Sequence, residues 1–147
     1  MKTFHARIAT AALAGAALLA GPAVQAQNSE LPVLPDVQQQ GDVQFLSGGI
    51  GAGQSGAFKT AARQYRLMLT FVQRGPDGRG EFLADVPVQI RNAAGQTVLD
   101  TVSQGPYLLA NLPAGTYTVK ASANGSDKSA RVSVGRSGTA SAVFEWR

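Results

Sequence analysis

Gly105-Pro106-Tyr107-Leu108-Leu109-Ala110-Asn111-Leu112-Pro113-Ala114-Gly115-Thr116-Tyr117-Thr118-Val119-Lys120-Ala121 is the stretch that decides the fold. It predicts a strand, a tight turn and a second strand. The turn lies at 112–115, because Pro113 presets φ at about −65° and Gly115 takes positive φ at no steric cost. After it, Tyr117, Val119 and Ala121 alternate with polar residues, which is the period of a half-buried strand.

Similar segments, divided by Gly, Pro and Asn turns, lie on both sides of this hairpin. Together with its two strands they make seven from residue 65 onward; the others are 65–72, 84–91, 96–102, 128–134 and 139–146. This spacing predicts an all-β protein, a seven-stranded antiparallel Greek-key sandwich. One short helix, expected within 55–64 and capped by Ser55, precedes the first core strand.

The first 26 residues predict a secretory signal peptide. A basic start is followed by an apolar run at 8–20 and by a Gly-Pro break, and we expect cleavage between Ala26 and Gln27. A membrane anchor is disfavoured, because the run is shorter than the ~20 residues that span a bilayer. There is no cysteine for lipid attachment. We therefore expect a periplasmic or secreted protein with no membrane insertion after cleavage.

Beyond the signal peptide (1–26) the sequence predicts three further parts. Residues 27–41 are expected to form a flexible N-terminal lead, because they contain two prolines and a glutamine run without periodicity. Residues 42–64 are expected to hold a short strand at 43–46, a Gly-rich loop and the short helix. Residues 65–147 are expected to form the sandwich.

Composition excludes several kinds of chemistry. The chain has no cysteine, and its one histidine, His5, lies in the predicted signal peptide. The mature chain therefore lacks the groups for Ser-His-Asp or Cys-His catalysis and for nearly all zinc sites. We expect no enzyme activity, no metal and no cofactor. The formal net charge is +4, but the basic residues are scattered, which argues against nucleic acid as a partner.

Three stretches resemble the carboxypeptidase regulatory-like domain. They are ADVPVQI at 84–90, AGQTV at 94–98 and, most specific, LPAGTYTV at 112–119. The resemblance covers roughly residues 65–146 and implies a transthyretin-like (prealbumin-like) sandwich. The segments at 48–51 and 144–146 are also similar to those of small exported proteobacterial proteins. The resemblance implies no established activity, and the related hydroxyisourate hydrolases use histidines that the mature chain lacks.

One segment matches a nucleotide-binding pattern formally. Residues 51–56, Gly-Ala-Gly-Gln-Ser-Gly, fit G-x-G-x-x-G. That motif needs a βαβ unit to bring a helix N-terminus to a pyrophosphate, and none follows here. A flexible loop is the favoured interpretation.

Two further groups of residues have a functional and a structural interpretation. Tyr107, Tyr117 and Trp146 could form a sugar-stacking platform, but core packing is favoured because buried aromatic residues dominate sandwich cores. Glu81 and Asp85 could serve as acid and base, but isolated carboxylates at strand edges are usually solvated.

The leading hypothesis is a non-catalytic exported module that binds a protein partner, and the alternative is carbohydrate binding through exposed aromatic residues. An open sheet edge can accept a partner strand. We expect recognition in the Gly-rich segment, the loops or an open edge, with Gly49, Gly51 and Tyr107 as candidate binding residues. The hairpin at 105–121 is expected to be scaffold.

Overall fold

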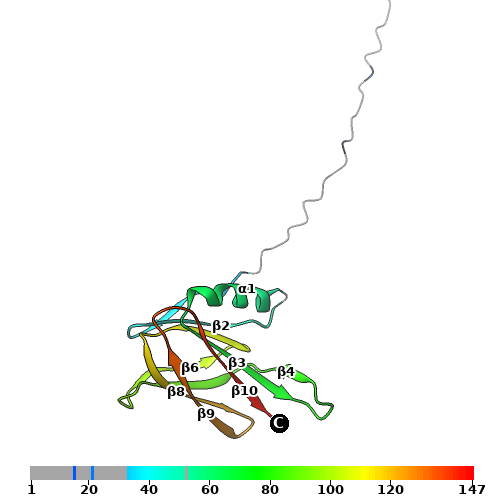
Figure 1. Cartoon of the computed structure of the whole chain (residues 1–147). Helices are drawn as coiled ribbons and strands as arrows, with labels where there is room; N and C mark the ends of the chain where they lie inside the picture. Colours follow the sequence, from blue (N-terminus) through cyan, green and yellow to red (C-terminus); the bar gives the residue numbers. More distant parts are fainter. Residues whose placement is uncertain (1–14, 16–20, 22–32, 52) are drawn as a thin grey trace, which may run out of the picture.

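The computed structural model describes residues 33–51 and 53–147, together with the isolated residues 15 and 21. These residues form two facing β-sheets and one helical segment on the outside (Figure 1). The predicted cleavage site between Ala26 and Gln27 lies outside the described residues, as does nearly all of the predicted signal peptide. The expected all-β sandwich with one short helix is confirmed.

The first sheet has the strand order β1-β2-β7-β3-β10, with β4 also beside β3. Its strands are β1 (Gln38–Gln40), β2 (Val43–Gly48), β3 (Leu67–Arg74), β4 (Gly80–Phe82), β7 (Tyr107–Asn111) and β10 (Ala140–Trp146). The second sheet has the order β6-β5-β8-β9 and comprises β5 (Val86–Arg91), β6 (Thr97–Ser103), β8 (Gly115–Ala123) and β9 (Ser126–Val134). After the β5–β6 hairpin the chain crosses to the first sheet as β7. It returns as β8 beside β5, which is a Greek-key connection. β7 and β8 therefore do not pair, and the hairpin predicted at 105–121 is wrong: this stretch joins the two sheets, and Gly115 begins β8 without a positive φ.

The main core lies between the two sheets. Alternate residues of each strand are buried there, as Val86, Val88 and Ile90 of β5 illustrate. Phe71 of β3 packs against Phe144 and Trp146 of β10, with ring centroids 5.8 Å and 6.4 Å away. Burial of these large apolar side chains is the main term that stabilises the sandwich.

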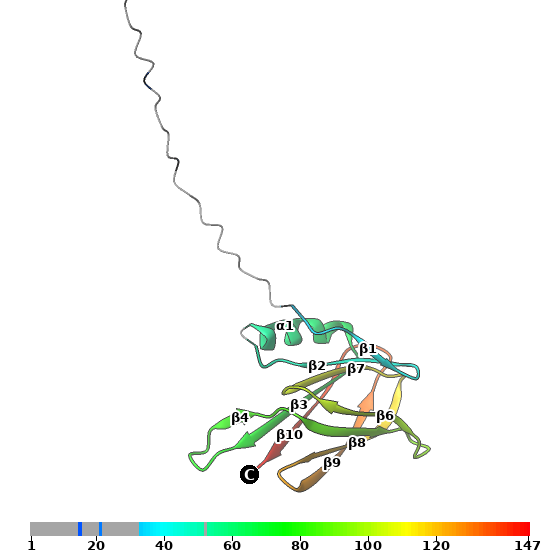
Figure 2. The same cartoon turned by 180° about the vertical axis from the view of Figure 1, so that it is seen from behind.

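A second, smaller core lies on the outer face of the first sheet. There α1 (Gln54–Ala61) and the 3-10 turn η1 (Ala62–Gln64) cover β2 and β7 (Figure 2). Phe58 is fully buried in it beside Leu46 and Leu109. Thr139, just before β10, lies with Oγ1 2.6 Å from the carbonyl oxygen of Ala62, so its hydroxyl can donate to the end of α1.

The described residues form ten strands, where the sequence pattern predicted seven. The seven predicted strands are β3 and β5 to β10, and β1, β2 and β4 are additional. The expected strand at 43–46 becomes β2, and it belongs to the sandwich because it pairs with β7. The predicted flexible lead, 27–41, contains β1. That strand is entirely polar and exposed, so it carries no apolar periodicity, and it forms by pairing with β2.

The sheets are also not wholly antiparallel. β10 runs parallel to β3, from Ala140 beside Leu67 to Trp146 beside Gln73. β10 enters the first sheet from β9 of the other sheet, so no tight hairpin with β3 dictates its direction. The alternating sequence pattern identifies strands but does not distinguish parallel from antiparallel neighbours.

Candidate functional site

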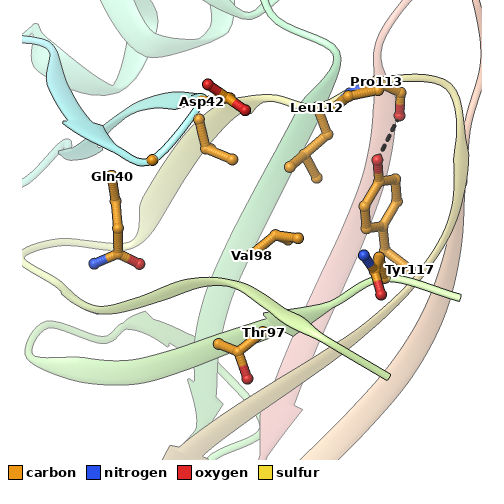
Figure 3. A pocket seen from close by; sticks show the side chains of 10 residues that line it. Gln40, Asp42, Thr97, Val98, Leu112, Pro113 and Tyr117 are labelled. Carbon is orange, nitrogen blue, oxygen red and sulfur yellow. Dashed lines mark hydrogen bonds between the residues drawn. The ribbon is translucent and has the colours of Figure 1, made fainter. Parts of the chain in front are cut away.

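A pocket of about 370 Å³ opens at one end of the sandwich, where turns from both sheets meet (Figure 3). We call it the end pocket. Its lining comes from the β1–β2 turn, the beginning of β6, the β5–β6 turn and the β7–β8 turn. The lining residues are Gln40, Gly41, Asp42, Val43, Asn92, Thr97, Val98, Leu112, Pro113 and Tyr117.

One wall of the end pocket is the turn between β7 and β8, which carries the chain from the first sheet to the second. The Tyr117 hydroxyl donates a hydrogen bond to the carbonyl oxygen of Pro113 over 2.6 Å, as the dashed line in Figure 3 marks. Burial raises the pKa of the Tyr117 phenol, so this group stays neutral. The bond fixes the turn against β8, so that Leu112 and Tyr117 present a rigid apolar surface to the pocket.

Gln40 fixes the position of the opposite side of the end pocket. Its Nε2 donates to the carbonyl oxygen of Asp100 over 3.1 Å, and the Asp100 N–H donates to its Oε1 over 2.7 Å. A single side-chain amide thus pairs with β6 as a backbone strand would. Gly41 follows with a φ of 57°, the left-handed conformation that a tight turn requires. These contacts hold the exposed Asp42 at the rim.

The third part of the lining is the β5–β6 turn. The Oδ1 atom of Asn92 accepts hydrogen bonds from the N–H groups of Ala94 and Gln96, over 3.1 Å and 2.9 Å. Such a bond pattern closes a tight turn with an asparagine side chain. The turn delivers Thr97 and Val98 to the pocket at the beginning of β6.

The chemistry of the end pocket suits binding better than catalysis. Val43, Val98 and Leu112 supply apolar surface, and Asp42 supplies one carboxylate. A general acid and base need two titratable groups that can exchange protons with a substrate. Among the lining residues the other titratable group is Tyr117, and its hydroxyl donates its hydrogen to the carbonyl oxygen of Pro113.

The three candidate binding residues from the sequence do not form an open site. Tyr107 is buried, with 3% of its surface exposed. Its hydroxyl accepts a hydrogen bond from Ser55 Oγ over 2.9 Å, and its ring packs beside Phe58 with centroids 5.9 Å apart. Gly49 is buried against the same ring, since an added Cβ would lie 2.5 Å from Tyr107 Cδ2. Gly51 is exposed in the loop that leads into α1.

The Gly-rich loop is a connection into the helix. Gly53, with a φ of 76°, is the N-cap residue of α1 in place of the expected Ser55, whose hydroxyl donates a hydrogen bond to the Tyr107 hydroxyl. β2 before the loop is antiparallel to both of its neighbours. β3, which follows the helix, is separated from β2 by β7, so the adjacent parallel strands of a dinucleotide-binding βαβ unit are not formed here.

Core packing, the favoured interpretation of the three aromatic residues, is confirmed by their burial, and the alternative of an exposed sugar-stacking platform is contradicted. Tyr107, Tyr117 and Trp146 have exposed fractions of 3%, 5% and 2%. Trp146 Nε1 donates to the carbonyl oxygen of Ser126 over 3.0 Å, so even its polar edge is used inside the protein. These three rings cannot stack on a sugar, and their role is in the two cores.

Glu81 and Asp85 are both exposed, the first in β4 and the second in the loop before β5. In the part of the chain that the structure describes, no group of three or more His, Cys, Asp or Glu residues could hold a metal ion. Nor does any described helix have the length and apolar character to cross a membrane.

Sequence reasoning missed the end pocket. The hairpin at 105–121 was expected to be scaffold, yet its turn is a wall of the pocket. The other lining residues come from three separate parts of the chain, and Asp42 and Thr97 belong to no recognisable motif. No pattern at short range marks them, because the turns meet only when the sandwich closes.

A scan against protein-family models finds no match to this chain, and a search of the curated proteins finds none either. The resemblance to the carboxypeptidase regulatory-like domain therefore stays a prediction.

Proposed function

We propose that this protein is a non-catalytic binding module that recognises a protein partner through the end pocket. The observation that supports the proposal is the composition of the lining, an apolar interior with a single carboxylate, Asp42, at the rim. The predicted signal peptide would place this module in the periplasm or outside the cell.

A basic side chain of the partner fits this lining best. Lysine and arginine carry an apolar stem and a cationic head, and they bury the stem while the head stays near water. Val98 and Leu112 offer a surface for the stem, and Asp42 offers the charge for the head. The exposed ion pair between Asp42 and the partner's cation would add modest affinity. Its larger effect would be to orient the partner, as charges at the rim of protein interfaces do.

Site-specific photocrosslinking in the native host tests this proposal. A photoreactive amino acid replaces Thr97, which is exposed at the pocket, and in a second variant it replaces Gln104, which is exposed in the β6–β7 turn outside the lining. We expect a crosslinked protein band from position 97 that is absent from position 104. Equal crosslinking at both positions, or none at position 97, contradicts the proposal.

A pair of charge variants tests the role of Asp42. Combined with the photoreactive residue at 97, Asp42→Asn should lower the crosslinked yield several-fold, because it removes the carboxylate while keeping the shape. Glu81→Gln is the matched control, since it removes one exposed carboxylate in β4. An unchanged yield with Asp42→Asn would show that the partner does not use this charge.

A further inference from the structure

We propose that the outer face of the second sheet binds an acidic polysaccharide, at a row formed by Arg91, Thr118 and Arg131. We call these three residues the basic row. The inference is independent of the end pocket and of its protein partner. It also differs from the sugar-stacking alternative, because it relies on charge and hydroxyl groups in place of aromatic rings.

The strand register creates the basic row. Arg91 of β5 lies directly beside Thr118 of β8, and Thr118 lies directly beside Arg131 of β9. Adjacent strands are about 4.8 Å apart, so the two arginine Cα atoms are separated by about 10 Å on one face. Two long cationic side chains therefore flank a short hydroxyl-bearing one. An anion that lies between the two guanidinium groups is attracted by both.

The protein surface at the basic row is concave. A depression of about 500 Å³ is lined by both arginines together with Thr116 and Thr118. A second depression, of about 240 Å³, shares Arg91 and Thr118 and adds Lys120. The two depressions adjoin each other at Arg91 and Thr118, on the face formed by β5, β8 and β9. An elongated ligand that crosses the strands would contact all three cations.

The lining contains no carboxylate. Its other polar residues are amides and hydroxyls, Gln89, Asn92 and Ser129 among them. The ion pairs found within the described ranges join Arg74, Arg79 and Lys120 to carboxylates, and neither arginine of the basic row takes part. Lys120 Nζ lies 3.3 Å from Oδ2 of Asp127, a residue that lines neither depression. The charge of Lys120 is therefore partly balanced. The two arginines carry the attraction for an anion.

The lining favours an acidic polysaccharide over single-stranded nucleic acid. The amide and hydroxyl side chains can hydrogen-bond to sugar hydroxyls. The guanidinium groups can bind carboxylate or sulfate groups in bidentate geometry. Single-stranded nucleic acid is bound by stacking its bases on aromatic rings, and neither depression is lined by one.

Isothermal titration calorimetry with an oligogalacturonate tests the inference. The matched probe is the same oligomer with its carboxylates methyl-esterified, which keeps the sugar and removes the charge. We expect the acidic oligomer to bind, to bind more weakly at higher salt, and the ester not to bind. Arg91→Gln and Arg131→Gln should each weaken binding about tenfold, because each removes a charge-assisted contact.

Arg79→Gln is the control variant, since it removes one charge from an exposed side chain in the β3–β4 turn, outside both depressions. It should change affinity less than twofold. Amide signals of Thr118 and Arg131 in the unmodified protein should shift on titration, which tests the site without any substitution. Equal binding of the ester, equal loss with Arg79→Gln, no binding of the acidic oligomer, or shifts confined to other strands would each overturn the inference.

Discussion

At the scale of single residues, close contacts between backbones decide where glycine is needed. Gly105, in the β6–β7 turn, lies so close to β2 that an added Cβ would be 2.4 Å from the carbonyl carbon and oxygen of Gly48. Those atoms belong to the backbone at the end of β2, which is hydrogen-bonded to β7, and they cannot turn aside as a flexible side chain would. The turn that carries the chain from one sheet to the other therefore depends on this residue.

Gly105→Ala should destabilise the protein by about 1–3 kcal/mol, the usual cost of forcing an extra carbon into packed structure. Gly56→Ala is the matched control, because Gly56 lies in α1 with open space around its Cα. Alanine there should be neutral or stabilise by up to ~1 kcal/mol. Urea unfolding of both variants measures the two effects. Equal stabilities would show that β2 can move away from the turn.

At the scale of elements, the parallel pair of β3 and β10 is joined by an ion pair on the outer face. Arg74 Nε and Nη2 donate to the two carboxylate oxygens of Glu145, over 2.8 Å and 3.1 Å. This bidentate hydrogen bonding, together with the charge of Arg74, holds the pKa of Glu145 below its usual range. The pair is exposed, so its main effect is on the pH dependence of stability.

The sign of that dependence follows from the lowered pKa. The pair stabilises the folded state above the usual glutamate pKa of 4.5, and this contribution is lost as the pH falls through the lower folded value. Arg74→Gln should move the pKa of Glu145 back up, and less stability should then be lost on acidification. NMR titration of the Glu145 carboxyl carbon measures the shift, with Arg79→Gln as a control of equal charge. The same titration midpoint in Arg74→Gln would contradict this account.

At the scale of the whole molecule, two cores are stacked and one sheet edge is protected. The larger core lies between the sheets, and the smaller lies under α1. β6 is one of the two edge strands of the second sheet, and the Gln40 side chain hydrogen-bonds to the backbone N–H and carbonyl groups of Asp100 at its middle. Blocking an edge in this way prevents a second chain from pairing with it.

Gln40→Ala should expose the edge of β6, and we expect self-association at concentrations where the unmodified protein stays monomeric. The amide hydrogen of Asp100 should also exchange faster, because its acceptor is lost. Gln38→Ala is the matched control, an exposed residue of the same strand. Sedimentation velocity and hydrogen exchange measure the two effects. Unchanged sedimentation with faster exchange would show that another feature protects this edge.

Much of the architecture was predictable because it rests on local rules. Alternating apolar residues and Gly, Pro or Asn turns identified β3 and the strands from β5 to β10. β1 and β4 escaped prediction because three exposed residues carry no periodicity, and they form only by pairing with β2 and β3. The candidate residues Gly49 and Tyr107 were chosen by residue type, and their burial against each other depends on α1 packing over them.

The amino-acid sequence by itself determined the all-β class, the two strands on either side of the Pro113 turn, and the lack of thiol and imidazole chemistry beyond residue 26. The tertiary structure alone decided the parallel pairing of β10 with β3, the end pocket and the basic row. The physical reason is the distance along the chain over which each interaction acts. Strand periodicity and turn geometry act over a few neighbouring residues, whereas a site assembled from distant turns or from three strands exists only once register and sheet packing are set.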